Sequence, residues 1–133
     1  MSTNEKQGQV PEVVLKDLSF QIMAAVFEVH NILGHGFLEN VYEKALTVEL
    51  SLRGIASETQ KPLKVYYKGE DVGTYVSDII VDDQIIIELK SVEKLMPAHE
   101  AQLLNYLKAT GKKLGLLINF GKERVEHKRF VYS

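Results

Sequence analysis

The 133-residue chain contains no cysteine, which excludes disulfides, thiol chemistry and zinc sites built on thiolates. It also lacks any apolar run near the ~20 residues that a membrane helix needs. Its polar start, MSTNEKQGQ, has no signal-peptide pattern, so we expect a cytoplasmic protein without a membrane span. The net charge of −2 leaves no excess of positive charge with which to coat nucleic acid.

The composition, with 45% hydrophobic and 26% charged residues, is typical of a globular protein. A chain of this length is expected to form one domain. Because its first residues are mostly polar, we expect residues 1–14 to form a disordered lead and residues 15–133 to form the domain.

The most informative stretch of the sequence is YVSDIIVDDQIIIELK, residues 75–90. Two β-branched apolar runs flank Asp82-Asp83, which is typical of an antiparallel hairpin. A three-residue loop, Asp82 to Gln84, places Asp78 directly opposite Glu88. The other face of the hairpin is then wholly apolar, with Ile79, Val81, Ile85, Ile87 and Leu89. A one-residue slip would lose this separation, so we predict this loop or an equivalent bulge.

Three charged residues share the opposite face of this hairpin: Asp78, Glu88 and Lys90. Glu88 and Lys90 are two residues apart and therefore project from the same side of a strand. Two facing carboxylates repel each other, and their burial is costly unless a positive charge pairs with them. Two interpretations stay open: a divalent cation held by hard oxygen ligands, or Lys90 as a plain salt-bridge partner.

The spacing of Asp78 and Glu88-Leu89-Lys90 resembles the core motif of the PD-(D/E)XK nuclease superfamily, with Ser77 where the motif has proline. The stretch Gly36-Phe-Leu-Glu39-Asn-Val-Tyr42 resembles the pattern of the small GxxExxY proteins, which are assigned to the same superfamily.

A third similarity is the segment HEAQLLNYL, residues 99–107, followed by GLLINFG. The resemblance runs from about residue 18 to residue 131. It implies a PD-(D/E)XK restriction-endonuclease-like α/β core, in which helices flank a small mixed sheet with an antiparallel hairpin at its centre.

The resemblance also implies a metal-dependent nuclease that hydrolyses phosphodiester bonds of nucleic acid, with DNA favoured over RNA. Asp78, Glu88 and the Leu89 carbonyl would hold Mg²⁺ or Mn²⁺, and Glu39 would complete the site. Lys90 would position or help deprotonate the attacking water. For Glu39, a favourable charge at a helix N-terminus is the competing interpretation.

Other candidates lie on the predicted helices. Tyr42 would orient Glu39 or simply pack. Gln102 and Tyr106 resemble the Q-x-x-x-Y element of RecB-like nucleases, which lies beside the metal site. With His99 they share one face of the helix expected over 98–109. The competing interpretation is the polar edge of an amphipathic helix.

Two further helices are expected over 15–33 and 38–53, the second with an apolar stripe of Val41, Ala45, Val48 and Leu52. Short strands are expected over 57–61 and 64–68, broken at Pro62.

An alternative function is a catalytically weak or inactive nuclease-fold module that binds nucleic acid or a protein partner. The small size and the acidic first half favour it, whereas the intact Asp78, Glu88 and Lys90 set disfavours it. A homodimer or a subunit of a larger complex is a third interpretation.

Overall fold

The structure, a computed structural model, describes residues 12–132. Its elements in chain order are α1 (Glu12–Leu33), α2 (Glu39–Leu52), β1 (Ser57–Tyr67), β2 (Glu70–Val81), β3 (Ile85–Lys90), α3 (Pro97–Thr110), β4 (Leu114–Asn119) and β5 (Glu126–Val131). The strands form one five-stranded sheet in the order β1-β2-β3-β4-β5. Neighbouring strands are antiparallel except β3 and β4, which α3 connects as a parallel pair.

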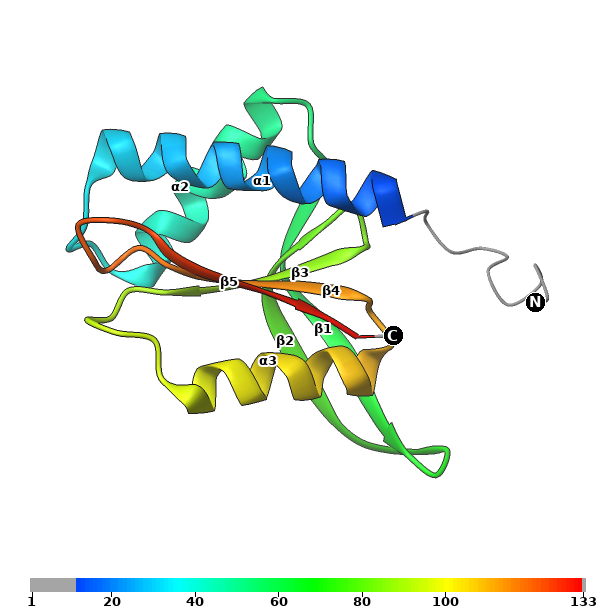
Figure 1. The fold of residues 1–133 in the computed structure, drawn as a ribbon. Helices are drawn as coiled ribbons and strands as arrows, with labels where there is room; N and C mark the ends of the chain where they lie inside the picture. Colours follow the sequence, from blue (N-terminus) through cyan, green and yellow to red (C-terminus); the bar gives the residue numbers. More distant parts are fainter. Residues whose placement is uncertain (1–11, 133) are drawn as a thin grey trace.

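The helices form layers on the two faces of this sheet: α1 and α2 lie on one face and α3 lies on the other (Figure 1). Each face has its own apolar cluster, the larger under α1 and α2 and the smaller under α3. The predicted α/β core with a central antiparallel hairpin is therefore confirmed. No helix within residues 12–132 is long and apolar enough to cross a membrane.

The β2–β3 hairpin has the predicted register. Val81 pairs with Ile85, which leaves the three-residue loop Asp82 to Gln84. Asp82 and Asp83 are left-handed, with φ of 52° and 55°, and the Gln84 amide donates to the Val81 carbonyl at 2.9 Å. These are the features of a primed turn followed by one extra residue. The predicted apolar face is confirmed, because its five residues are all buried under α1 and α2.

Each helix is followed by a glycine, because the chain turns there into a left-handed conformation. Gly34, Gly54 and Gly111 follow the three helices with φ between 73° and 76°. The first helix begins at Glu12, inside the segment 1–14 that we expected to form a disordered lead, so that expectation is wrong for residues 12–14. Residues 1–11 of that segment lie outside the described part of the chain.

Two sequence-based expectations are wrong. The apolar stripe predicted for α2 is largely exposed, with Val48 at 50% and Leu52 at 77% exposure, because the helix buries Tyr42, Leu46 and Leu50 instead. The strand expected to break at Pro62 is continuous from Ser57 to Tyr67. Proline is tolerated there because β1 is an edge strand, where one side makes no ladder hydrogen bonds.

The orientation of α2 is testable with two leucines of the same helix. Leu46 is fully buried whereas Leu52 is 77% exposed. We expect Leu46→Ala to lower the free energy of unfolding by about 2–5 kcal/mol, as large-to-small core changes do. Leu52→Ala should change it by less than about 0.5 kcal/mol. Urea denaturation measures both, and equal losses would contradict this orientation.

Candidate active site

The candidate site lies where the β2–β3 ladder ends. The last paired residues are Ile79 and Ile87, and continuing the register brings Asp78 opposite Glu88. The Leu89 amide does not pair with the backbone of β2 but donates to Asp78 Oδ2 at 2.9 Å. The carboxylate of Asp78 therefore takes the place of a backbone acceptor at the point where the two strands separate.

The Leu89 carbonyl lies in the same gap. In β3 the neighbouring Lys90 carbonyl accepts from the Phe120 amide, which follows β4. Because successive residues of a strand direct their backbone groups to opposite sides, the Leu89 groups point toward β2. The Leu89 carbonyl, which we predicted as a metal ligand, is thus directed into the gap between β2 and β3.

The β1–β2 pairing is irregular at the same level. Thr59 pairs with Ile79 and Lys61 with Ser77, but Gln60 and Asp78 between them are unpaired. Gln60 has φ of 51°, an uncommon value for a residue other than glycine. Strict alternation along β2 is lost at this point.

The irregularity brings Tyr75 to the α3 face of the sheet. Its hydroxyl donates to Glu88 Oε1. The Tyr75 ring stacks on the Tyr106 ring, with centroids 3.4 Å apart and planes inclined by 19°. Gln102 Nε2 in turn donates to the Tyr106 hydroxyl at 2.8 Å. Two predicted residues of α3, Gln102 and Tyr106, are therefore joined to Glu88 through Tyr75, a residue that was not predicted from sequence.

Glu88 is partly buried, and this burial raises the pKa of its carboxyl group to about 7. A hydrogen bond from the Asp78 backbone and the charge of Lys90 act in the opposite direction, whereas the charges of Glu39 and Glu43 raise the pKa further. At neutral pH, Glu88 is thus divided between its two protonation states, and a nearby cation would favour the ionised one.

Lys90 is partly buried, and no ion pair within residues 12–132 includes it. The salt-bridge interpretation of the hairpin charges therefore has no direct contact to support it. Ser77, at the proline position of the motif, is fully buried, and its hydroxyl has no hydrogen-bond partner among the described residues. An apolar residue would fit this position at least as well.

The start of α2 brings two further carboxylates toward the gap. Glu39 is its first residue and is exposed. Glu43, one turn later, accepts a hydrogen bond from Gln60 Nε2 at 2.8 Å. Burial, and then the nearby charges of Asp78 and Glu39, raise the pKa of Glu43 against the hydrogen bond from Gln60. Glu43 was not among the site residues predicted from sequence, although its spacing of four from Glu39 puts both on one helix face.

Tyr42 and His99 make local structural contacts. Tyr42 is fully buried, stacks on Phe120 with centroids 4.5 Å apart, and its hydroxyl donates to the Gly34 carbonyl at 2.6 Å. It thereby fixes the turn that leads into α2. His99 Nδ1 accepts from the Met96 amide at 3.1 Å and caps the start of α3.

A buried asparagine holds the segment that follows Lys90. Asn119 is completely buried, and its amide group makes four hydrogen bonds of 2.9–3.1 Å, two of them with the backbone of Val92. Any side chain at Gly121 would collide with this backbone, so glycine is required there. Ser91 Oγ also donates to the Phe37 carbonyl at 2.6 Å, which ties the end of β3 to the loop before α2.

The donor set suits a hard divalent cation, because it consists of carboxylates and one backbone carbonyl. As placed, no three histidine, aspartate or glutamate side chains of residues 12–132 are grouped closely enough to hold an ion. Two carboxylates and a carbonyl meet at the gap, and the side chains of α2 would have to move to add a third carboxylate.

A profile of the PD-(D/E)XK nuclease superfamily matches residues 16–130, so the chain belongs to this superfamily. The crystal structure of SSO0001 has a similar fold, with a TM-score of 0.51 and 21% identity over 70% of this chain and 50% of that one. An alkaline exonuclease (LHK-Exo) from Laribacter hongkongensis gives a TM-score of 0.49 and 13% identity over 65% and 52%. This chain thus spans about half the length of each. No curated protein matches it.

The raised pKa of Glu88 predicts a specific pH dependence of stability. The folded state keeps a proton up to about pH 7, whereas the unfolded carboxyl group releases it near 4.5. This contribution to stability is therefore present below about pH 4.5 and is lost as the pH rises through about 7. Glu88→Gln should raise the free energy of unfolding at about pH 8 by up to about 3 kcal/mol and leave it nearly unchanged at about pH 4.5.

Urea denaturation at several pH values, in buffer free of divalent metal, measures this difference. Glu93→Gln is the control, since its side chain is exposed in the segment after β3. A Glu88→Gln protein that is less stable than wild type at about pH 8 would show that the ionised carboxylate is stabilising, contrary to this account.

Proposed function

We propose that this protein is a metal-dependent nuclease that hydrolyses phosphodiester bonds of nucleic acid, with DNA favoured over RNA. The observation that carries the proposal is the pair Asp78 and Glu88 at the open end of the β2–β3 ladder. Neither carboxylate forms an ion pair within residues 12–132, and burial opposes the charged form of Glu88. A bound cation would remove this mismatch. Membership of a nuclease superfamily supports the same conclusion.

Asp78, Glu88 and the Leu89 carbonyl would hold Mg²⁺ or Mn²⁺, with one carboxylate of α2 beside them. When bound, the metal supplies stabilisation of the developing phosphate charge and lowers the pKa of its water. Lys90 follows directly in β3, and its ammonium group would orient the attacking water or neutralise charge on the phosphate.

Tyr75 and the residues of α3 have a positioning role in this proposal. The Tyr75 hydroxyl donates to Oε1 of Glu88 and so holds the carboxylate at the gap. Stacking on Tyr106, which Gln102 holds through a hydrogen bond, limits the movement of Tyr75. The Gln102–Tyr106 element therefore acts on the carboxylate through an intermediate ring.

The alternative is a nuclease-fold module that binds nucleic acid or protein without cleaving it. The absence of a three-residue ligand cluster among residues 12–132 is the observation in its favour. The two proposals differ in one measurable property, which is whether occupancy of the gap by metal is accompanied by hydrolysis.

Calorimetric titration with Mn²⁺ and Mg²⁺ tests the metal site. We expect binding to the wild type that grows stronger as the pH rises through about 7, because the ion displaces the proton of Glu88. Glu88→Gln should weaken binding by at least about tenfold while keeping the fold. Glu93→Gln should bind like wild type.

Cleavage of labelled single- and double-stranded DNA and RNA then tests the reaction. Lys90→Met should still bind metal but lose most cleavage, by a factor on the order of 10² or more. Metal binding by the wild type without cleavage of any of these substrates would support the binding module instead. Failure to bind metal, alone or with a short oligonucleotide present, would contradict the metal site itself.

The carboxylate contributed by α2 is a separate question. The family resemblance points to Glu39, whereas the structure holds Glu43 in place through Gln60 and leaves Glu39 exposed. We expect Glu43→Gln to reduce Mn²⁺ affinity by about 10-fold or more, and Glu39→Gln to reduce it less. Glu49→Gln, on the same helix but paired with Arg53, controls for loss of charge. A larger loss with Glu39→Gln would identify Glu39 as the ligand.

A further inference from the structure

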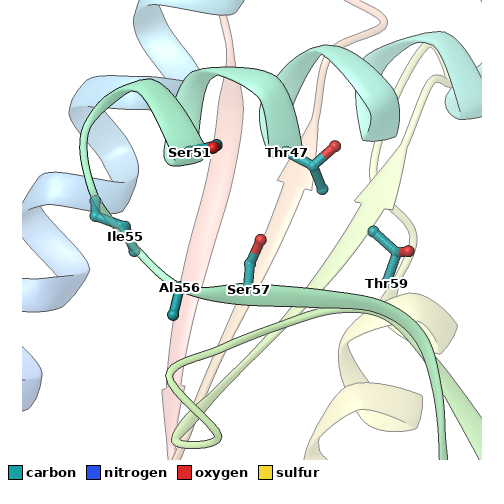
Figure 2. A pocket seen from close by; sticks show the side chains of 6 residues that line it. All are labelled: Thr47, Ser51, Ile55, Ala56, Ser57 and Thr59. Carbon is teal, nitrogen blue, oxygen red and sulfur yellow. The ribbon is translucent and has the colours of Figure 1, made fainter.

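A hollow of about 430 Å³ lies between α2 and the start of β1, lined by Thr47, Ser51, Ile55, Ala56, Ser57 and Thr59. Figure 2 shows the two α2 residues above it and Ser57 and Thr59 projecting from β1 toward the helix. The hollow is open to solvent, since Ser51, Ala56 and Thr59 are exposed.

The chemistry of the lining is neutral and amphipathic. Four of the six residues carry hydroxyl groups, and none carries a charge. The Thr47 hydroxyl donates to the Lys44 carbonyl at 2.8 Å. Within residues 12–132, the hydroxyls of Ser51, Ser57 and Thr59 have no hydrogen-bond partner in the protein and remain available to a ligand. The Ile55 side chain and the threonine methyl groups supply apolar surface.

The hollow adjoins the candidate active site along both elements that form it. On α2, Glu43, Thr47 and Ser51 are spaced four residues apart, so each is a neighbour of the next on the helix surface. On β1, Thr59 directly precedes Gln60, which binds Glu43. A ligand that extends from the carboxylates along α2 would enter this hollow.

We propose that the hollow binds one unpaired nucleoside, its base and sugar, of the substrate strand whose phosphate lies at Asp78 and Glu88. This inference rests on the proposed nuclease function and specifies a substrate that is single-stranded beside the cleavage point. Serine and threonine hydroxyls can donate to or accept from any base edge. A neutral, partly apolar lining suits a base and sugar better than it suits a phosphate.

The distance along α2 from Glu43 to the hollow is compatible with the spacing of nucleotides in one strand. Thr47 and Ser51 follow Glu43 by four and eight residues, which is about 6 and 12 Å along the helix axis. Nucleotides of a duplex strand rise by about 3.4 Å each. At that rise, the hollow lies about two to four nucleotides from Glu43, and a more extended single strand would span the same distance with fewer nucleotides.

The test uses thymidine and adenosine as probes on the full chain without metal, followed by ¹H–¹⁵N NMR. We expect shifts confined to the amides around Thr47, Ser51 and residues 55–59. Ser51→Leu and Ser57→Leu fill the hollow from its two sides and should weaken nucleoside binding by at least about tenfold. Thr74→Leu, an exposed hydroxyl-to-leucine change in β2, is the matched control and should bind like wild type.

The same variants are then assayed on a single-stranded decanucleotide with Mn²⁺. Filling the hollow should raise KM about tenfold and leave kcat unchanged, since the carboxylates are intact. Cleavage with unaltered KM, and no nucleoside shifts, would overturn the hollow as a binding site while the nuclease function stands. Nucleoside shifts that Ser51→Leu removes, in a protein that cleaves nothing, would support the site and count against the nuclease function. If Ser57→Leu does not fold, Ser51→Leu, on the exposed side of α2, decides the question.

Discussion

The hydrogen bond from the Leu89 amide to the Asp78 carboxylate is the interaction on which the rest of the site depends. If the ladder continued, a backbone carbonyl of β2 would accept from this amide and the two strands would stay in contact. A side-chain carboxylate satisfies the same donor while the strands separate. The separation leaves the Leu89 carbonyl directed into the gap and brings Glu88 beside Asp78. The replacement of a backbone acceptor by a side-chain carboxylate thus ends the sheet pairing and brings the oxygen atoms of Asp78, Glu88 and Leu89 to one gap.

Because the gap lies within the sheet, groups from both helical layers can reach it. On the α3 side, the stack of Tyr75 and Tyr106 contacts Glu88. From the opposite layer, the start of α2 supplies Glu39 and Glu43; burial is the main cause of the raised pKa of Glu88, and the charges of these two residues add to it. The connections are fixed by polar contacts, such as the hydrogen bond of Ser91 to the Phe37 carbonyl. A rigid frame around a gap with few internal contacts is what a site for a charged ligand requires.

The hairpin was predictable because one register alone separates its charged and apolar residues, and the structure has that register. The role of Tyr75 was not, since alternation along β2 fails where Gln60 and Asp78 are unpaired. This irregularity depends on the left-handed backbone conformation of Gln60, which the surrounding sequence does not predict. The buried face of α2 was also missed, because this helix has apolar residues on more than one side and Leu46 and Leu52 are equally good candidates from sequence.

The two carboxylates differ in what the fold requires of them. Asp78 has a structural task, since removing it leaves the Leu89 amide without its acceptor; a loss of stability at this position therefore says little about metal. Glu88 accepts from the Tyr75 hydroxyl and from the Asp78 backbone, and burial still raises its pKa to about 7. A neutral residue of the same shape would stabilise the fold at least as well. Near pH 8 it would raise the free energy of unfolding by up to about 3 kcal/mol. Residues that lower the stability of the fold, and whose presence no structural role explains, are characteristic of functional sites. Glu88 is thus the position at which fold and function make opposite demands.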